Sequence, residues 1–93
     1  MEFDLWYHED VKKRDIPQLS SSWKKRIQVT IEQKLIKQPE IFGKPLRKSL
    51  KGYRKLRIGE YRVIYGIENK KVKIFIIQHR KVVYRTVLKR TIS

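Results

Sequence analysis

Cysteine is absent from this 93-residue chain, so disulfide bonds and cysteine-based zinc sites are both excluded. No apolar run approaches the length of a membrane-spanning helix. The first ten residues, MEFDLWYHED, are acidic and lack the basic start of a signal peptide. By elimination we expect a cytoplasmic protein. No carboxylate cluster accompanies either histidine, so we also expect no metal and no cofactor.

Acidic residues are scarce in the second half of the chain. Residues 44–93 hold two of them, Glu60 and Glu68, against sixteen Lys and Arg, whereas residues 1–43 hold seven against eight. Nearly all of the formal net charge of +15 therefore lies in residues 44–93. The aromatic residues interleaved with these cations are Tyr53, Tyr61, Tyr65, Phe75 and Tyr84. Cations release counterions from phosphates and rings stack on bases, so the pattern predicts a polyanion-binding surface. The alternative is a solvated cationic face with tyrosines in the core.

The first half of the chain predicts one strand and two helices. MEFDLWY reads as a strand with Phe3, Leu5 and Tyr7 on one face. A short helix is expected over residues 8–16, ended by Pro17.

The clearest helix is predicted over residues 20–38. Serines at its start offer an N-cap, and Pro39 stops it. Apolar residues recur every four positions, which predicts a core-facing stripe. Its members are Trp23, Ile27, Ile31 and Leu35.

The second half predicts three strands, YRKLRI, YRVIYGI and KVKIFIIQHR, after a loop over residues 40–52. Short turns at Gly59-Glu60 and Asn69-Lys70 make them antiparallel hairpins. Residues 82–93 form a tail that is either a frayed strand or a short helix. The predicted class is α+β in the order β-α-α-β-β-β, with two N-terminal helices packed on one face of a twisted, mostly antiparallel sheet.

Both faces of that sheet carry apolar side chains. Alternation places Arg62 and Ile64 opposite the face that holds Tyr61, Val63, Tyr65 and Ile67. In the last strand it places Val72, Ile74 and Ile76 on one face and Phe75 and Ile77 on the other. The two helices can cover only one face. The second therefore requires the tail, a partner or a ligand over it.

The stretch LRKSLKGYRKLRIGEYRVIY, followed by IIQHRKVVY, resembles the RelE/ParE superfamily of toxins from bacterial and archaeal toxin–antitoxin pairs. The resemblance covers almost the whole chain, as a single RelE-like toxin domain over residues 1–93. The strand arginine and the terminal HR…Y are closer to the RelE branch, which cleaves mRNA, than to the ParE branch, which poisons gyrase.

The resemblance implies a metal-independent ribonuclease that cuts mRNA in the ribosomal A site and is silenced by a cognate antitoxin. Carried over to this sequence, the family's catalytic residues fall on Lys55, Arg62, Arg80 and Tyr84. The RelE type has a second lysine where this chain has Tyr53, and Arg54 or Lys51 are possible substitutes. His79 recurs in many relatives and is a candidate for acid–base chemistry. The expected partners are the antitoxin, the ribosome and mRNA.

The chemistry is also reasonable on the residues alone. A 2′-hydroxyl that attacks its neighbouring phosphate needs a base, an acid for the leaving oxygen and cations for the developing charge. Arginine suits phosphate because its donors form a fixed fork, and a lysine crowded by cations loses its proton more readily. The additional RNA-binding candidates are Lys51, Arg54, Arg57 and Lys81.

Several alternatives stay open. Arg62 has a structural reading as an ion pair with Glu60 or Glu68, Tyr84 as a packed tail residue, and His79 as a hydrogen-bonding strand end. Two alternative functions also stay open for the whole chain: a ParE-like gyrase inhibitor, or a catalytically weak RNA- or ribosome-binding domain. We expect the antitoxin to be acidic with an apolar helical stripe. It would lie across the sheet or displace the short basic tail, which is a poor permanent cover.

Overall fold

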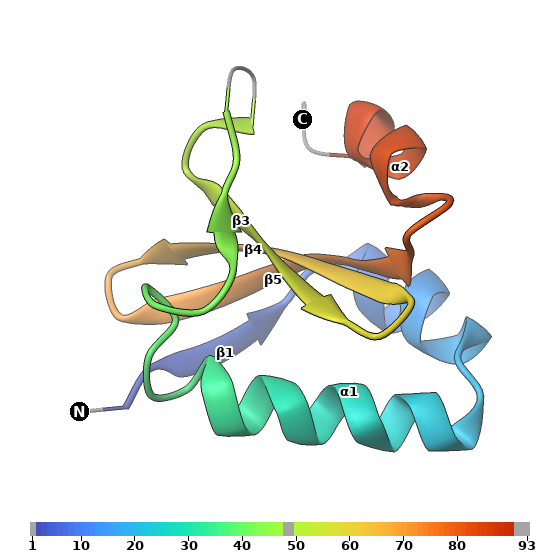
Figure 1. Ribbon diagram of the computed structural model, residues 1–93, viewed down its shortest axis with the longest axis horizontal. Coiled ribbons are helices and arrows are strands. Elements are labelled where there is room, and N and C mark those ends of the chain that lie inside the picture. Colours follow the sequence, from blue (N-terminus) through green and yellow to red (C-terminus); the bar gives the residue numbers. More distant parts are fainter. Residues whose placement is uncertain (1, 48–49, 91–93) are drawn as a thin grey trace.

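A five-stranded mixed sheet in the order β1-β5-β4-β3-β2 forms the centre of the computed structural model, which describes residues 2–47 and 50–90 (Figure 1). β1 is parallel to β5, and the other neighbours are antiparallel. The strands are β1 (Asp4–Tyr7), β2 (Lys44–Pro45), β3 (Tyr53–Ile58), β4 (Tyr61–Glu68) and β5 (Lys71–His79). The predicted class and the three long strands are confirmed, whereas β2 lies inside the predicted loop. Parts of that loop (48–49), of the first strand (Met1) and of the tail (91–93) lie outside the described residues.

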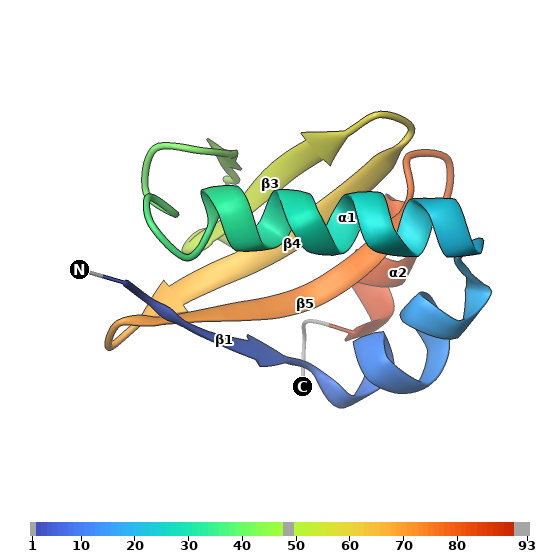
Figure 2. The same ribbon diagram turned by 90° about the horizontal axis from the view of Figure 1, so that it is seen from below.

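Helices cover both faces of the sheet. α1 (Ser21–Lys34) lies across one face and α2 (Val83–Arg90) lies on the other, as the two ribbon views show (Figures 1 and 2). The described part of the tail is therefore the short helix of the two forms predicted for it. Across the described residues, no helix has the length and apolar character needed to cross a bilayer.

The segment before α1 is helical but irregular. A π-helical turn, η1 (Val11–Asp15), runs directly into a 3-10 turn, η2 (Ile16–Gln18). The prediction that Pro17 ends the helix at Ile16 is wrong. Pro17 occupies the first turn of η2, where a proline lacks only an N–H that would have no helical partner.

α1 begins where the serine run predicts. The Ser20 hydroxyl accepts a hydrogen bond from the Trp23 amide at 3.3 Å, which caps the helix. Ile27, Ile31 and Leu35 are buried against the sheet, which confirms the apolar stripe. The regular helix ends at Lys34, one turn earlier than predicted.

The sheet separates two hydrophobic cores of unequal size. The larger core lies on the α1 side and includes Val63, Tyr65, Val72 and Ile74, whereas Ile64 faces α2. The predicted alternation of β4 is thus confirmed.

The alternation predicted for the end of β5 is wrong, because the register with β4 shifts after Ile74. Tyr65 pairs with Ile74 and Ile64 pairs with Ile76, so Phe75 is a bulge. Ile76 therefore joins the α2-side core and Ile77 returns to the α1 side. One extra residue in a strand exchanges the faces of everything after it.

A buried ion pair fastens α2 to the sheet. Asp15 is 2% exposed, and its carboxylate accepts hydrogen bonds from the Ile77 amide at 2.9 Å and from Gln78 at 3.0 Å. The Arg90 guanidinium lies 2.7 Å from the same carboxylate, and its side chain is 7% exposed. Thr86 of α2 also donates a hydrogen bond to Gln78. The last turn of α2 is thereby linked to the residue that ends η1. We name this the Asp15–Arg90 clamp.

Candidate active site

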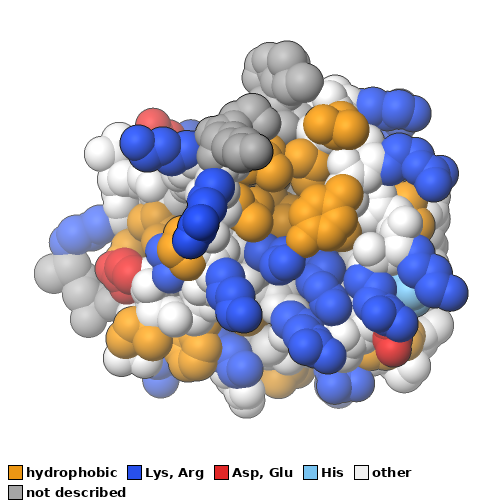
Figure 3. Space-filling model, turned by 45° about the horizontal axis from the view of Figure 1, so that its top comes forward, with side chains coloured by type: hydrophobic (Ala, Val, Ile, Leu, Met, Phe, Trp, Pro, Cys, Tyr) orange, Lys and Arg blue, Asp and Glu red, His pale blue; other side chains and the backbone are white. Residues whose placement is uncertain are grey.

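The strand register gathers cations on the face of the sheet that carries α2. Arg57 of β3 pairs directly with Arg62 of β4, and Lys55 lies two residues before Arg57 on the same face. Like charges directly opposite one another destabilise a sheet, so an anion between them would relieve the repulsion. On this face, Lys and Arg side chains form a band beside exposed hydrophobic side chains (Figure 3). We call it the basic face.

A groove of about 450 Å³ runs along the edge of this face. Its cations are Lys44, Lys55, Arg57 and Arg62, and its remaining lining is Ile41, Phe42, Gly43 and Leu56. Lys44 is a residue that the sequence analysis missed, because a two-residue strand has no recognisable alternation. Antiparallel pairing of Lys44 with Lys55 brings it to the site.

α2 places Tyr84 over the basic face. The Lys55 ammonium donates a hydrogen bond to the Tyr84 hydroxyl at 2.7 Å and lies 5.4 Å from the centre of the ring. Tyr84 is 50% exposed, so it is not the packed tail residue of the alternative reading. A cation and a phenol in direct contact can share a proton near a bound phosphate.

The Gly59-Glu60 turn orients two arginines. Arg62 donates hydrogen bonds to the carbonyls of Gly59 at 3.0 Å and Tyr61 at 2.9 Å. Arg80 binds the Glu60 carboxylate at 2.6 Å, and the hydrogen bond and charge of Arg80 lower the pKa of Glu60. Both arginines are therefore anchored at one end of the β4–β5 pair.

The structure decides against the predicted ion-pair alternative for Arg62. Within the described residues, Glu60 pairs with Arg80 and Glu68 pairs with Lys73, and neither carboxylate forms a salt bridge with Arg62.

His79 and Arg54 lie away from the basic face. His79 pairs with Tyr61 in the sheet, and their rings pack edge to face 5.6 Å apart on the α1 side. Arg54 donates hydrogen bonds to the carbonyls of Gly43 at 3.0 Å and Phe42 at 3.4 Å. The structure therefore does not bring these two predicted residues together with Arg62. Adjacent strand residues point to opposite faces, so Arg54 faces away from its neighbour Lys55.

The other RNA-binding candidates are exposed. Arg57 lines the groove, Lys81 follows Arg80 at the end of β5, and Lys51 borders a separate hollow beside Tyr53. Tyr53, which replaces the second family lysine, packs edge to face on Phe75 with ring centres 4.8 Å apart. An aromatic contact thus stands where the resemblance leads us to expect a cation.

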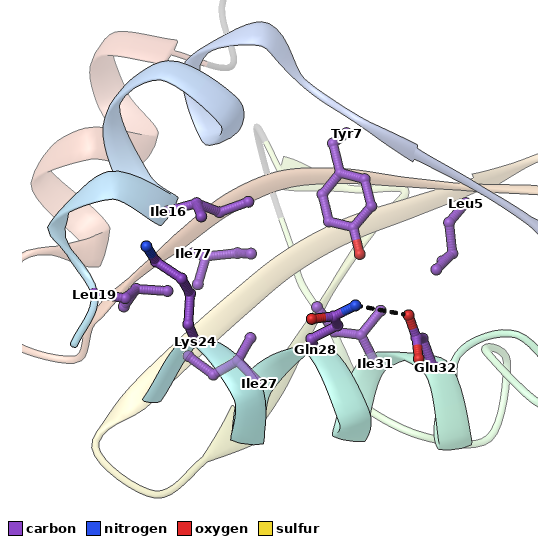
Figure 4. Close-up of a pocket in the computed structure, with 10 residues that line it drawn as sticks. All are labelled: Leu5, Tyr7, Ile16, Leu19, Lys24, Ile27, Gln28, Ile31, Glu32 and Ile77. Atoms are coloured by element: carbon purple, nitrogen blue, oxygen red, sulfur yellow. Dashed lines mark hydrogen bonds between the residues drawn. The ribbon is translucent and has the colours of Figure 1, made fainter. Parts of the chain in front are cut away.

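A further hollow of about 300 Å³ lies between α1 and the sheet (Figure 4). Most of its lining is apolar, and polar groups from Tyr7, Gln28 and Glu32 meet at one side. Burial and the nearby Glu32 charge raise the pKa of Tyr7. Lys24 is its one cation, so this hollow is poorly suited to phosphate. In the described part of the chain, no three His, Asp or Glu side chains form a group able to hold a metal ion.

The chain is similar to known toxins along most of its length. Residues 8–84 match the family described as the ParE toxin of the type II toxin–antitoxin system parDE. Over 53 residues the chain is 42% identical to Toxin RelE from Mycobacterium tuberculosis, a stretch that makes up 55% of each protein. The matched region thus spans about half the length of that curated relative.

Solved structures show the same fold. One chain of the toxin–antitoxin complex RelBE2 from Mycobacterium tuberculosis superposes with a TM-score of 0.75 and 28% identity, covering 86% of this chain and 100% of that one. YafQ from E. coli gives a TM-score of 0.58 at 19% identity, covering 88% and 98%. The fold and the matched residues define a small α+β toxin of the RelE/ParE type. The chain belongs to the ParE toxin family of type II toxin–antitoxin systems.

Proposed function

We propose that this toxin is a metal-independent endoribonuclease that cleaves mRNA on the ribosome and so inhibits translation. The observation that carries the proposal is the cluster on the basic face, where Arg57 and Arg62 are paired and the Lys55 ammonium contacts the Tyr84 hydroxyl. The local identity to Toxin RelE and the resemblance to the mRNA-cleaving branch support it.

The proposed reaction uses the 2′-hydroxyl of the RNA as the nucleophile. Its proton is taken up by the Lys55–Tyr84 pair, which must first lose one proton to solvent, while the bond from O2′ to phosphorus forms. Arg62 stabilises the negative charge that develops on the phosphate oxygens, because its donors are fixed by the turn before reaction begins. The bond from phosphorus to O5′ then breaks, O5′ takes up a proton from water, and the pair releases to solvent the proton that it accepted from O2′. The products are a 2′,3′-cyclic phosphate and a 5′-hydroxyl end.

Arg80 and His79 take different parts in this proposal. Arg80 is held by Glu60, so an incoming phosphate must compete with that carboxylate for its guanidinium. His79 lies on the α1 side, and we propose that it positions Arg80 through the strand end rather than exchanging protons with RNA. Replacing His79 should therefore change the rate of cleavage without removing the alkaline or acidic limb of its pH profile.

Expression of the chain in cells tests the proposal. We expect arrest of growth and translation, with new mRNA 5′ ends inside coding regions detected by primer extension. Arg62→Ala should remove these ends. The control is Lys34→Ala, which also removes one positive charge but lies in α1, on the opposite face of the sheet. Normal translation combined with a collapse of DNA supercoiling would contradict the proposal.

That contrary result would favour a ParE-like gyrase inhibitor, the second candidate. The family match, which is to ParE toxins, is the observation in its favour. A third candidate is a catalytically weak ribosome-binding domain, which the aromatic contact at Tyr53 favours. It would bind ribosomes without producing new mRNA ends.

We also propose a cognate antitoxin that covers the basic face. Tyr84 and Leu88, 50% and 68% exposed, lie one helical turn apart on α2 beside the cations. An acidic helix with an apolar stripe would match both features. The solved relative RelBE2 is a toxin–antitoxin complex. Because Arg90 is clamped by Asp15, we propose that this partner packs over α2 without removing it. Binding should raise the melting temperature, since a ligand of the native state stabilises it by mass action.

A further inference from the structure

A row of four residues crosses the sheet on the face that carries α2, at the end opposite to the Gly59-Glu60 turn. Trp6 of β1 pairs with Lys73 of β5, Lys73 pairs with Gly66 of β4, and Gly66 pairs with Tyr53 of β3. Residues paired in this way share one face. The row therefore has an aromatic ring at each end and a gap at the glycine.

The rings of this row belong to a larger aromatic cluster. The Phe75 bulge places its ring between them, 6.5 Å from Trp6 and 4.8 Å from Tyr53. Both contacts are edge to face, an arrangement in which one ring presents its edge rather than its face. His8 extends the cluster, with its ring 5.9 Å from Phe75. Trp6 is 45% exposed, an unusual exposure for the largest side chain, and a ligand would cover it.

The glycine opens a hollow in the middle of the row. A volume of about 330 Å³ lies above Gly66, and its lining is Lys51, Gly52, Tyr53, Gly66, Ile67, Glu68, Lys73 and Phe75. A glycine inside a strand weakens the sheet and often marks the close approach of a ligand. Gly66 is not required by backbone geometry, since its φ is not among the positive values of this chain. The volume is at the lower end of small-ligand sites.

Polar groups around the hollow fit a nucleobase. Lys73 lies 5.9 Å from the centre of the Trp6 ring and pairs with Glu68. The hydrogen bond and charge of Lys73 lower the pKa of Glu68, so its carboxylate is ionised at neutral pH and can accept from a base amino group. Gly66 is four residues from Arg62 along β4 on the same face, about 13 Å away at the strand repeat.

The geometry points to a nucleobase-binding site at this row, in which an unpaired base of single-stranded RNA enters the hollow over Gly66, stacks on Tyr53 and displaces Lys73, whose ammonium lies against the Trp6 ring. The inference rests on the proposed function for the identity of the ligand as RNA. The site would fix where along a bound strand the phosphate meets Arg62. Bound RNA would then contact the protein at two places, the groove beside Arg62 and this base site.

The test uses the two tryptophans of the chain as matched reporters. Trp23→Phe leaves Trp6 as the sole tryptophan, and Trp6→Phe leaves only Trp23, which packs on Tyr61 on the α1 side. A six-nucleotide 2′-O-methyl RNA, which cannot be cleaved, is the probe. We expect it to quench the fluorescence of the Trp23→Phe protein and to leave that of Trp6→Phe unchanged. Equal quenching in both, or quenching in neither, would overturn the site.

Filling the hollow gives the second arm. A Cβ at Gly66 would meet the Tyr53 ring at 3.4 Å, an ordinary contact, so Gly66→Ala should fold. It should weaken binding of the probe about 10-fold, because stacking on the row is impeded. Tyr53→Leu, which removes a ring without adding bulk, should weaken it by a similar factor. Unchanged affinity in both variants would contradict the inference, as would capture of an acidic peptide by Trp6 in place of RNA.

Arg62→Ala separates this inference from the proposed function. It should reduce cleavage of ribosome-bound mRNA on the order of 100-fold and still allow quenching of Trp6 by the probe. If the wild-type protein does not cleave but Trp6 is quenched, the proposed function fails and the base site stands. If it cleaves and Trp6 does not respond, the base site fails alone.

Discussion

The two faces of one sheet differ in how completely they are covered. Among the described residues, twelve buried side chains form the core on the α1 side, and four form the core on the α2 side. The α1 side holds the continuous apolar stripe of α1, whereas the α2 side receives only an eight-residue helix. The larger core accounts for the stability of the fold. The smaller one leaves Arg57 exposed and Lys55 and Arg62 partly exposed.

Charge follows the same division. The paired Arg57 and Arg62 point to the less covered face, where they repel each other, while Arg54 points to the covered face and binds carbonyls. A basic residue with carbonyl partners serves the fold, and basic residues opposed to one another are suited to a ligand. The direction in which a cation points therefore matters more than its place in a charged run.

The largest expected effect is on the clamp that joins the two sides. Asp15→Ala should lower the free energy of unfolding by about 3–5 kcal/mol, because it leaves Arg90 at a buried position without its closest carboxylate. Chemical denaturation measures this. Asp10→Ala is the control, since Asp10 contacts the same arginine at 3.6 Å and is more exposed. Similar losses of unfolding free energy in both variants would show that the burial of Asp15 does not make its ion pair more important than that of Asp10.

The next effect compares two arginines on opposite faces. Arg62→Ala should reduce cleavage on the order of 100-fold, because it removes a positioned donor from a developing charge. Arg54→Ala removes the same charge from the α1 side and should leave the rate per folded molecule nearly unchanged. Single-turnover cleavage with the folded fraction measured in parallel separates the two. Equal loss in both would end the distinction between the faces.

A smaller effect concerns the salt dependence of binding. Each phosphate contact to single-stranded RNA contributes about −0.7 to the slope of log affinity against log salt. Arg57→Glu and Lys81→Glu should each flatten that slope. Lys12→Glu and Lys34→Glu, from the balanced half of the chain, should change it little. Filter binding across a salt series provides the measurement, and matching slopes in the two sets would remove the argument from charge.

The smallest effect is on pH dependence. Arg80 lowers the pKa of Glu60, so this ion pair is intact above the carboxyl's ordinary value of 4.5 and is lost as pH falls through its lower folded value. Protonation releases Arg80, and affinity for the uncleavable RNA should rise slightly in that acidic range. Glu60→Gln should already bind more tightly at neutral pH and show no such rise. A rise that persists in the variant would exclude Glu60 as its origin.

Sequence patterns predicted most of the fold, because local signals there were strong. The Ser20 cap, the stripe through Ile27 and Ile31, and the turn at Asn69-Lys70 are each set by neighbouring residues. Both residues of that turn have positive φ, as a tight hairpin requires.

The predictions that failed, and the contacts that were not predicted, depend on signals that are not local in sequence. β5 is apolar on both faces, so its alternation has no polar mark from which to place the Phe75 bulge. His79 and Arg54 were selected for their neighbours in sequence, although the pleat turns adjacent residues apart. The clamp joins residues 75 positions apart, and no local pattern pairs Asp15 with Arg90 among so many basic residues.

That clamp also constrains when the protein becomes complete during synthesis. Asp15 is synthesised 75 residues before Arg90, so its carboxylate must stay hydrated or protonated until the last turn of α2 docks. Tyr84 reaches its place over Lys55 only when α2 docks. The basic face is therefore complete only after α2 has docked on the sheet, and the docked helix is held by a residue from the other end of the sequence.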